Sequence, residues 1–377
     1  MPQTAIATES SHRHDPDLVI LTDYSSPYQV ELFELIETLA PGRIEVFYRT
    51  RTSEARGWSQ PTLKHAHYTL GNDPAMWAIA EQRFQRANLA VFNFYTDGRV
   101  RRLIHQRAAS RRPWVFWGER PGYITPRYGK FYRLWALRYL HRCHAPIWGI
   151  GGIAVQRYRE EFGGDHTYVN LPYFSNLQPF ENEAKRKKLE PEEARVILYS
   201  GSLIRRKGVD LLAKAFARLV ATGDAENVRL RIMGRGELET SMRRQLAGCL
   251  DKVEFVGFKD WGELPAEYGK AHLLCAPSRH DGWGLIVPEG LAAGLPVIST
   301  RSTGAAVDLI EPHRNGWLIP ANNQEALFTA LRQFAILPTD VLYQMSINAS
   351  ASVAEHTLAN GARRFLEAAD DAIERWR

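Results

Sequence analysis

The sequence from Ser278 to Thr300 is SRHDGWGLIVPEGLAAGLPVIST, and it continues the apolar run HLLCAPS that begins at His272. A short apolar run that ends in glycine and charged residues is typical of a buried strand. From Leu285 onward the spacing is helical and apolar, and LPVIST, from Leu295, is a second strand-like run. A strand, a helix and a strand in succession predict a crossover unit of a parallel sheet.

The same alternation extends outward from this unit in both directions, and helical spacing separates several of the runs. In the second half the strand-like runs are VILYS from Val196, VRLRIM from Val228, VEFVGF from Val253 and GWLIP from Gly316. In the first half they are LVIL (Leu18 to Leu21), IEVFY (Ile44 to Tyr48), LAVFNF (Leu89 to Phe94) and WVFW (Trp114 to Trp117). We therefore predict an α/β fold with parallel sheets in both halves and ligands at the carboxyl ends of the strands.

The length of 377 residues fits two domains. The segment PFENEAKRKKLEPEEA, from Pro179 to Ala194, is highly charged and nearly free of large apolar residues, which is typical of a linker. We predict an amino-terminal domain over 1–178, a linker over 179–194 and a second domain over 195–350. The remaining segment, 351–377, contains an amphipathic stretch from Leu358 to Arg377, which we expect to form a helix that packs back on the amino-terminal domain.

The composition excludes several classes of protein. Hydrophobic residues make up 45% and charged residues 24%, as in ordinary globular proteins. The three cysteines are too scattered for a disulfide framework or a structural zinc site, which favours a reducing compartment. No uncharged apolar run approaches the roughly 20 residues that span a bilayer. We expect a cytoplasmic protein, or one held at the inner face of a membrane.

The net charge of +6 is unevenly distributed. Between Arg99 and Arg142, twelve Lys or Arg residues stand against one acid, Glu119. Aromatic residues interleave with them, as in KFYRLWALRYLHR from Lys130 to Arg142, which is the composition of a basic amphipathic helix that could lie on anionic lipid. Two other interpretations stay open: a solvated basic face with aromatic residues in the core, and a nucleic-acid surface, although no known nucleic-acid motif accompanies the charge.

The segment from Ser278 to Thr300 also carries two acids, Asp281 and Glu289, with glycines around them. Gly284 lies near the start of the expected helix, where free backbone N–H groups attract a phosphate. Glu289 would lie in the first turns of that helix and could accept hydrogen bonds from a ribose diol, as acids do in other nucleotide-binding folds. The alternative is an Asp that caps the helix and an ordinary first-turn Glu.

A second candidate site is SGSLIRRKGVDLLAKAF, from Ser200 to Phe216, where a strand ends and Gly208 opens a helix. Its loop holds Arg205, Arg206 and Lys207, three cations suited to a diphosphate and to the charge that develops on a departing phosphate. The alternative is a solvated basic loop. A third segment, IMGRGEL from Ile232 to Leu238, has only G-x-G and lacks the later glycine of the dinucleotide fingerprint, which argues against a dehydrogenase.

Taken in order, these segments resemble the donor domain of the retaining glycosyltransferases of family 4, which have the GT-B fold of two Rossmann-like domains facing a central cleft. The resemblance is carried by GS-x-x-x-RKG, GRG, VEFVGF, DGWGLIVPEGLAAGLPVI, STGAAVDLI and NGWLIP between Val196 and Ile319. The first half is similar to a subset of the family in TDYSSPYQVELFELIETLA, from Thr22 to Ala40, and in WGIGGIAVQRYREEFGGDHTYVNLPYFSN, from Trp148 to Asn176.

The resemblance implies an enzyme that moves a sugar from a nucleotide-diphosphate sugar to an acceptor hydroxyl with retention of the anomeric configuration. It implies a glycan or lipid-linked acceptor, a role in glycan, lipopolysaccharide, exopolysaccharide or glycolipid assembly, and no metal or other cofactor. The D-x-D pair, Asp15 and Asp17, is then only a polar segment before the first strand. The alternatives are a GT-B epimerase or phosphorylase, and a protein that binds nucleotide-sugar or nucleic acid without catalysis.

The resemblance also implies roles for individual residues. Arg206 and Lys207 contact the donor diphosphate, and Asp281, where the family usually has Glu, faces the donor sugar. Glu289 binds the ribose. Many relatives have a histidine near the position of Glu119, which could contact the acceptor or the transferred sugar, or could be a structural carboxylate paired with Arg120 or another cation.

The remaining donor-binding residues that the resemblance implies belong to the loops after the strands. Gly257 and Phe258 flank the base, and the loop from Gly282 to Leu285 lies against sugar and phosphate. The family often has Arg at the position of Ser202, so we expect Arg205 or Arg206 to supply that charge. The full set is Gly201, Ser202, Arg205, Gly234, Gly257, Phe258, Gly282, Trp283, Gly284, Leu285 and Glu289.

Overall fold

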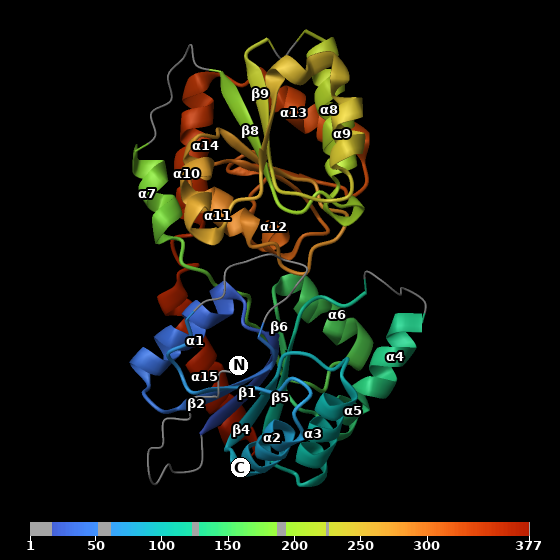
Figure 1. Cartoon of the computed structure of the whole chain (residues 1–377), viewed down its shortest axis with the longest axis vertical. Helices are drawn as coiled ribbons and strands as arrows, with labels where there is room; N and C mark the ends of the chain where they lie inside the picture. Colours follow the sequence, from blue (N-terminus) through green and yellow to red (C-terminus); the bar gives the residue numbers. More distant parts are fainter. Residues whose placement is uncertain (1–16, 52–61, 123–127, 187–193, 224–225, 377) are drawn as a thin grey trace, which may run out of the picture.

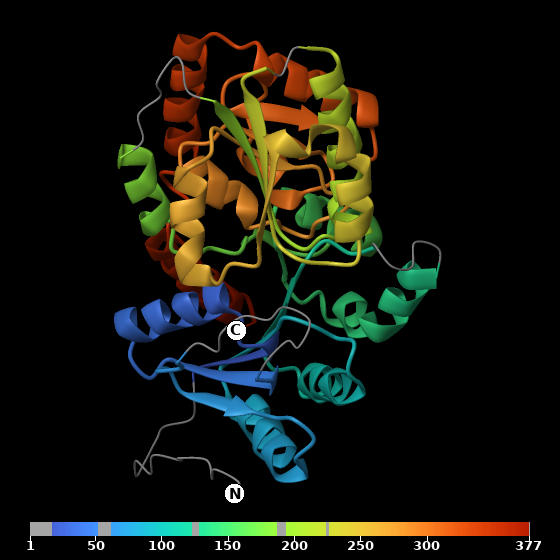
Figure 2. The same ribbon diagram turned by 45° about the horizontal axis from the view of Figure 1, so that its top comes forward.

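The computed structural model describes residues 17–51, 62–122, 128–186, 194–223 and 226–376. These residues form two parallel sheets, each flanked by helices, that lie one above the other along the long axis of the molecule (Figure 1). The predicted α/β class with a parallel sheet in each half is therefore confirmed. In the turned view of Figure 2 the two sheets remain separate, and loops and helix ends meet between them.

The first sheet has seven strands in the order β3-β2-β1-β4-β5-β6-β7. Its strands are β1 (Leu18–Tyr24), β2 (Ile44–Thr50), β3 (His67–Thr69), β4 (Leu89–Phe92), β5 (Trp114–Gly118), β6 (Ile147–Gly149) and β7 (Tyr168–Asn170). All pairs are parallel, with Leu18 of β1 opposite Ile44 of β2 and Leu89 of β4. The order reverses between β1 and β4, which is the point where a doubly wound sheet opens a crevice for ligands.

The second sheet has six strands in the order β10-β9-β8-β11-β12-β13 and reverses between β8 and β11. Its strands are β8 (Arg195–Ser200), β9 (Val228–Met233), β10 (Val253–Gly257), β11 (Leu273–Ala276), β12 (Val297–Thr300) and β13 (Gly316–Ile319). Every one of them falls on a strand-like run predicted from the sequence. Because β8 and β11 are neighbours, the loops that follow them, with the predicted cations and the first predicted acid, leave the sheet side by side.

Helices cover both sheets. The first domain contains α1 (Pro27–Leu39), α2 (Pro74–Arg86), α3 (Gly98–Ala109), α4 (Tyr128–Ala136), α5 (Arg138–Cys143) and α6 (Gly152–Phe162). The second contains α8 (Val209–Ala221), α9 (Glu239–Gln245), α10 (Leu264–Gly269), α11 (Ile286–Ala292), α12 (Gly304–Leu309), α13 (Gln324–Ala335) and α14 (Thr339–Ser352). Buried apolar residues of the two domains form one continuous cluster that includes Trp148, Phe174 and Trp283, so the domains are packed against each other.

The final helix, α15 (Leu358–Trp376), follows the second domain in sequence but packs on the first, against α1 and β4 (Figure 1). Its Phe365 contacts the rings of Phe33, Trp117 and Trp148 at centroid distances of 6.5, 5.5 and 5.4 Å. The side chain of Arg43 also pairs with Asp370. This helix therefore completes the core of the first domain.

The linker expected over 179–194 is partly wrong. Residues Gln178–Arg186 form helix α7, which packs on α10 and α11 of the second domain. The physical reason is Phe180, which is 2% exposed and packs edge-on against Tyr268 at 5.1 Å. One well-placed aromatic side chain is enough to dock an otherwise charged helix. The rest of the expected linker, 187–193, lies outside the described residues.

The single helix expected from Lys130 to Arg142 is two helices, α4 and α5, which meet at Leu137. Leu137 and Leu140 are completely buried, and the break lets α5 turn these side chains into the core. Parts of the basic run are structural as well. Arg107 is buried and donates to five backbone carbonyls, while Arg133 forms a bidentate pair with Glu161. The solvated-face interpretation is wrong for these two arginines.

Candidate active site

Three loops at the carboxyl ends of β8, β9 and β10 pack against one another. Gly234, after β9, has a φ of +138°, and a Cβ on it would lie 1.9 Å from the carbonyl oxygen of Gly201, after β8. Only glycine allows this approach. The N–H of Gly234 donates to the carbonyl of Gly257, after the bulge in β10, at 2.8 Å. The next residues along two of these loops, Ser202 and Phe258, are exposed, so the predicted donor-binding loops form one surface.

The predicted cation loop forms one turn of 3₁₀ helix, Arg205–Lys207, between β8 and α8. Arg279, in the loop after β11, fixes this turn from the outside. Its backbone N–H donates to the carbonyl of Arg206 at 2.8 Å. Its guanidinium forms a bidentate pair with Asp210 of α8 at 2.6 and 2.8 Å and also donates to the carbonyl of Arg205 at 2.6 Å. The cations are thus carried by a rigid turn rather than by a free loop.

Lys207 and Asp281 form the centre of the site. Lys207 Nζ donates to Asp281 Oδ2 at 2.5 Å, and Arg206 Nη1 lies 3.9 Å from Asp281 Oδ1 while donating to the carbonyl of His280 at 2.9 Å. Burial alone would raise the pKa of Asp281, but Lys207, with Arg206 behind it, holds that pKa below its usual range. Two cations therefore share one carboxylate, which leaves a net positive charge at this edge of the sheet.

Glu289 lies in the first turn of α11, as predicted, and is only 2% exposed. The hydroxyl of Tyr268 donates to its Oε2 at 3.1 Å. Burial raises the pKa of Glu289 to about 7, and the nearby carboxylate of Glu31 adds to the shift. Glu31 belongs to α1 of the first domain, where its own pKa is raised by burial and its Oε2 accepts from the backbone of Asn176 at 3.2 Å. The pKa of Glu289, the residue predicted to bind the ribose, is therefore influenced by a carboxylate of the opposite domain.

The loop from Gly282 to Leu285 connects Asp281 to α11 and also joins the two domains. The ring of Trp283 stacks on His356 at 5.6 Å, and a Cβ on Gly151 of the first domain would lie 2.7 Å from that ring. Gly284 has a φ of +89°, and a Cβ on it would lie 2.7 Å from the methyl group of Thr303. The Trp283 side chain, predicted to contact the donor, is thus used for packing between the domains, while the loop backbone continues from Asp281 to the start of α11.

Glu119 faces this loop from the first domain. It is exposed directly after β5, and a Cβ on Gly282 would lie 2.3 Å from its Oε2. Its backbone carbonyl accepts from the hydroxyl of Tyr158 at 2.8 Å. The next residue, Arg120, reaches across the same interface and donates to the carbonyl of Ser302 at 3.0 Å. The structure therefore brings Glu119 next to the segment that carries Asp281.

Several contacts that shape this site were not predicted from the sequence. They are the Arg279–Asp210 pair, the Tyr268–Glu289 hydrogen bond and the proximity of Glu31 to Glu289. Each joins residues far apart in the chain. The one local signal is that Asp210 lies in the first turn of a helix, where an acid is favourable because it interacts with the helix dipole. That position gives no indication of a distant arginine partner.

In the described part of the chain, no group of three or more His, Cys, Asp or Glu side chains is arranged to hold a metal ion. Of the D-x-D pair, Asp17 binds Arg43 and Asn88, both at 2.7 Å, and Asp15 lies outside the described residues. None of the helices in the described ranges is long and apolar enough to cross a bilayer.

Comparison with known families agrees with this geometry. Residues 180–350 match the family model described as glycosyl transferases group 1. We call this matched part, a little under half of the chain, the group 1 domain. The match begins within α7 and ends in α14, so it takes in every loop of the second sheet described above. The group 1 domain therefore supplies Lys207, Asp281 and Glu289, whereas Glu119 lies outside it.

Curated relatives resemble the group 1 domain at moderate identity. A GDP-mannose-dependent monoacylated alpha-(1-6)-phosphatidylinositol monomannoside mannosyltransferase of Corynebacterium glutamicum is 29% identical over 170 residues, which covers 41% of this chain and 44% of that protein. The phosphatidyl-myo-inositol mannosyltransferase of Mycobacterium leprae is 31% identical over 208 residues, or 54% of each chain. The chain thus spans about half the length of the curated relatives it matches.

Solved structures resemble the whole molecule. Anabaena HepE, solved in complex with UDP and glucose, superposes with a TM-score of 0.72 at 16% identity and covers 94% of this chain and 99% of its own. At this identity the likeness concerns the fold. It confirms the expected GT-B arrangement of two Rossmann-like domains, with the group 1 domain as the second of them.

Proposed function

We propose that this protein is a retaining, metal-independent glycosyltransferase that moves a sugar from a nucleotide-diphosphate sugar to an acceptor hydroxyl. The observation that carries the proposal is the pair of cations, Lys207 and Arg206, held around Asp281 within the group 1 domain. The GDP-mannose-dependent relative of Corynebacterium glutamicum and the HepE complex with UDP and glucose support a nucleotide-sugar donor. They also favour a role in glycolipid or polysaccharide assembly.

The chemistry asks for electrostatic stabilisation more than for a protein nucleophile. The bond between the anomeric carbon and the donor phosphate breaks, the acceptor oxygen bonds to the same face of that carbon, and the acceptor proton passes to the departing phosphate oxygen. Negative charge accumulates on the diphosphate, and fixed cations aimed at it lower the barrier. Lys207 and Arg206 meet this need because the rigid turn and Asp281 hold them in place without further reorganisation.

We assign the remaining residues by their place around this centre. Asp281, short and charged, would orient the sugar hydroxyls while keeping Lys207 in position. Glu289 would accept hydrogen bonds from the ribose, and Phe258, 37% exposed beside Gly257, would lie against the base. Glu119, on the opposite domain, would contact the acceptor or the transferred sugar, since its carboxylate reaches the Gly282 backbone.

The test begins with a thermal-shift screen of the purified protein in EDTA against UDP, GDP, ADP, dTDP and CMP and their sugar conjugates. A nucleotide at about 100 times its dissociation constant should stabilise the protein by about 2.7 kcal/mol. The donor found in this way is then incubated with acceptor glycans and lipid-linked sugars, and the anomeric configuration of the product is read by NMR. Inversion, or activity that disappears in EDTA and returns with a divalent cation, would contradict the proposed mechanism.

Two other functions predict different outcomes in these assays. An epimerase or a phosphorylase on the same fold would convert the sugar without any acceptor hydroxyl. A protein that only binds nucleotide-sugar would show the thermal shift but no turnover with any acceptor. A product that forms in the absence of acceptor, or a shift without turnover across the whole panel, would therefore refute glycosyl transfer to a hydroxyl.

A further inference from the structure

Helix α4 carries an aromatic patch that does not belong to the site described above. We define the patch as Phe131, Tyr132 and Trp135, whose exposed fractions are 72%, 40% and 54%. The spacing of these residues places them within one turn of the helix. Among the described residues, the other exposed aromatic side chains are Phe258, directly after β10, and Tyr343, on α14, and neither has a second exposed aromatic ring on its own segment. A cluster of large exposed apolar side chains on one turn marks a surface that meets a partner.

Cations surround the aromatic patch. The Arg101 guanidinium, from α3, lies 5.2 Å from the Trp135 ring and donates to the hydroxyl of Tyr132 at 3.0 Å. The Arg138 guanidinium, from α5, lies 5.5 Å from the same Trp135 ring. Lys130, next to the patch, is exposed. Three helices thus contribute positive charge to one aromatic surface.

The acids in this region do not neutralise that charge. The one acid between Arg99 and Arg142 is Glu119, which faces the second domain. Glu161 of α6 comes near α4, but it is 8% exposed and forms a bidentate pair with Arg133 beneath the helix. Within the described ranges, the exposed side of α4 therefore combines aromatic rings with three cations, Arg101, Lys130 and Arg138, that form no ion pair.

An anionic bilayer fits this combination better than a protein surface. Aromatic side chains flanked by Lys and Arg are the pattern of helices that lie in the headgroup region, where the rings enter the interface and the cations meet anionic lipid. Figure 2 shows α4 as a projecting helix at the right-hand side of the first domain. A convex helix can enter a bilayer surface, whereas a protein partner would have to supply a complementary apolar recess.

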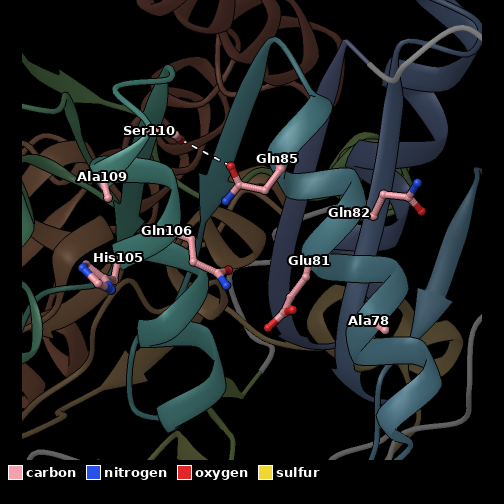
Figure 3. Close-up of a pocket in the computed structure, with 8 residues that line it drawn as sticks. All are labelled: Ala78, Glu81, Gln82, Gln85, His105, Gln106, Ala109 and Ser110. Atoms are coloured by element: carbon pink, nitrogen blue, oxygen red, sulfur yellow. Dashed lines mark hydrogen bonds between the residues drawn. The ribbon is translucent and has the colours of Figure 1, made fainter.

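A second copy of this chain offers no such recess in the groove between α2 and α3. Figure 3 shows that this groove is lined mainly by polar side chains. They include Glu81, His105 and the amides of Gln82, Gln85 and Gln106. Aromatic rings placed in this groove would remove water from the Glu81 carboxylate and the glutamine amides, which costs free energy unless these groups find new hydrogen bonds.

We propose that α4 docks the first domain on an anionic lipid bilayer. The aromatic patch enters the headgroup region, and Lys130, Arg101 and Arg138 lie beside anionic headgroups. This surface is separate from the proposed donor site, so the inference does not depend on the sugar-transfer reaction.

The test is sedimentation of the full chain with vesicles of phosphatidylcholine alone and of phosphatidylcholine mixed with phosphatidylglycerol. The wild-type chain should sediment with the anionic vesicles, release as salt is added and stay in solution with neutral ones. The double variant Phe131→Ser/Trp135→Ser should lose binding to the anionic vesicles by at least about tenfold, because the rings supply the apolar contact. Lys130→Glu should weaken the binding and its response to salt.

A matched control uses exposed apolar residues of the other domain. Tyr343 and Ile347, on α14, are 57% and 46% exposed, so Tyr343→Ser/Ile347→Ser removes comparable surface and should bind vesicles like the wild type. Circular dichroism confirms that each variant is folded. Equal binding of the α4 variant and the wild type, or equal binding to neutral and anionic vesicles, would overturn the proposal. The proposal would also be overturned if the wild type bound no vesicles and the α4 variant lost dimer formation in sedimentation velocity or lost binding to RNA.

Discussion

The carboxylate of Asp308, at the end of α12 in the second domain, accepts a hydrogen bond at 2.8 Å from the backbone N–H of Gly152, the first residue of α6 in the first domain. The side-chain amide of Asn170 donates to the same oxygen at 3.3 Å. The first N–H groups of a helix lack partners within it and carry partial positive charge, which a carboxylate satisfies. The start of α6 is therefore capped by the other domain.

Removing this cap should loosen the contact between the domains. Asp308→Ala should lower the melting temperature, with a cost of about 0.5 to 1 kcal/mol because the carboxylate is exposed. X-ray scattering should show a larger radius of gyration. Asp308→Asn keeps an oxygen that can accept the bond and should lie between the two. Identical melting and scattering for Asp308→Ala and the wild type would show that the cap does not hold the domains.

Lys207 should be needed for turnover. Lys207→Ala should lower kcat by about 100-fold or more, because a fixed cation that stabilises the departing phosphate is lost. It also leaves Asp281 buried beside Arg206 alone, so the melting temperature should fall as well. The matched control is Lys214→Ala, at an exposed position of α8, which should behave as the wild type in both measurements. Near-normal kcat in Lys207→Ala would remove this lysine from the mechanism.

Glu289 should make stability depend on pH in an unusual direction. Its pKa is about 7 in the folded protein against an ordinary 4.5, so between these values the folded chain holds a proton that the unfolded chain has released. The free energy of unfolding should therefore fall as pH rises from about 4.5 to about 7, by at most about 3 kcal/mol. Glu289→Gln removes this loss. The stability of the variant minus that of the wild type should therefore be greater at pH 8 than at pH 5. Thermal melts at both pH values measure the difference, and a constant difference would contradict it.

The same substitution bears on the ribose assignment. Glu289→Gln should raise the dissociation constant of the donor nucleotide, because a neutral amide accepts hydrogen bonds from a diol more weakly than a carboxylate. Isothermal titration measures this constant directly. An unchanged constant would mean that the carboxylate serves only the Tyr268 hydrogen bond.

Gly234→Ala should disrupt the loops of the second sheet. The added methyl group would overlap the Gly201 carbonyl, and the φ of +138° is one that alanine rarely adopts. We expect a loss of about 2 kcal/mol or more in stability and a loss of donor binding. Gly262→Ala is the control, since a Cβ there meets nothing within 4 Å. Thermal melts with and without nucleotide check both expectations, and equal melts for the two variants would exclude close loop packing as the reason for Gly234.

The second sheet could be predicted strand by strand, but the first could not. Runs such as VRLRIM are long enough to be recognised, and all six strands of the second sheet fall on one. By contrast β3, β6 and β7 have three residues each, too few to show a period. The sequence does not predict helix α7 because the charge of this segment is typical of a linker. It does not predict the break at Leu137 because the break depends on the burial of Leu137 and Leu140 in the core.

The site could be predicted in its residue types but not in its contacts. Lys207 and Asp281 lie 74 residues apart, and their pairing depends on β8 and β11 being neighbours in the sheet. No local pattern specifies that order. Likewise, the packing of Trp283 against Gly151 and the reach of Glu119 to Gly282 exist only once the two domains face each other.

The position of α15 has a consequence for how the chain is made. Phe365 fills the space against Phe33, Trp117 and Trp148, yet a ribosome releases those three residues long before it releases Phe365. The first sheet therefore waits for the synthesis of the entire second domain before its last helix can dock. A nascent chain that stops before Leu358 keeps an aromatic face uncovered. Chaperones and proteases can recognise such a face, so incomplete chains are distinguished from finished ones by the folding order itself.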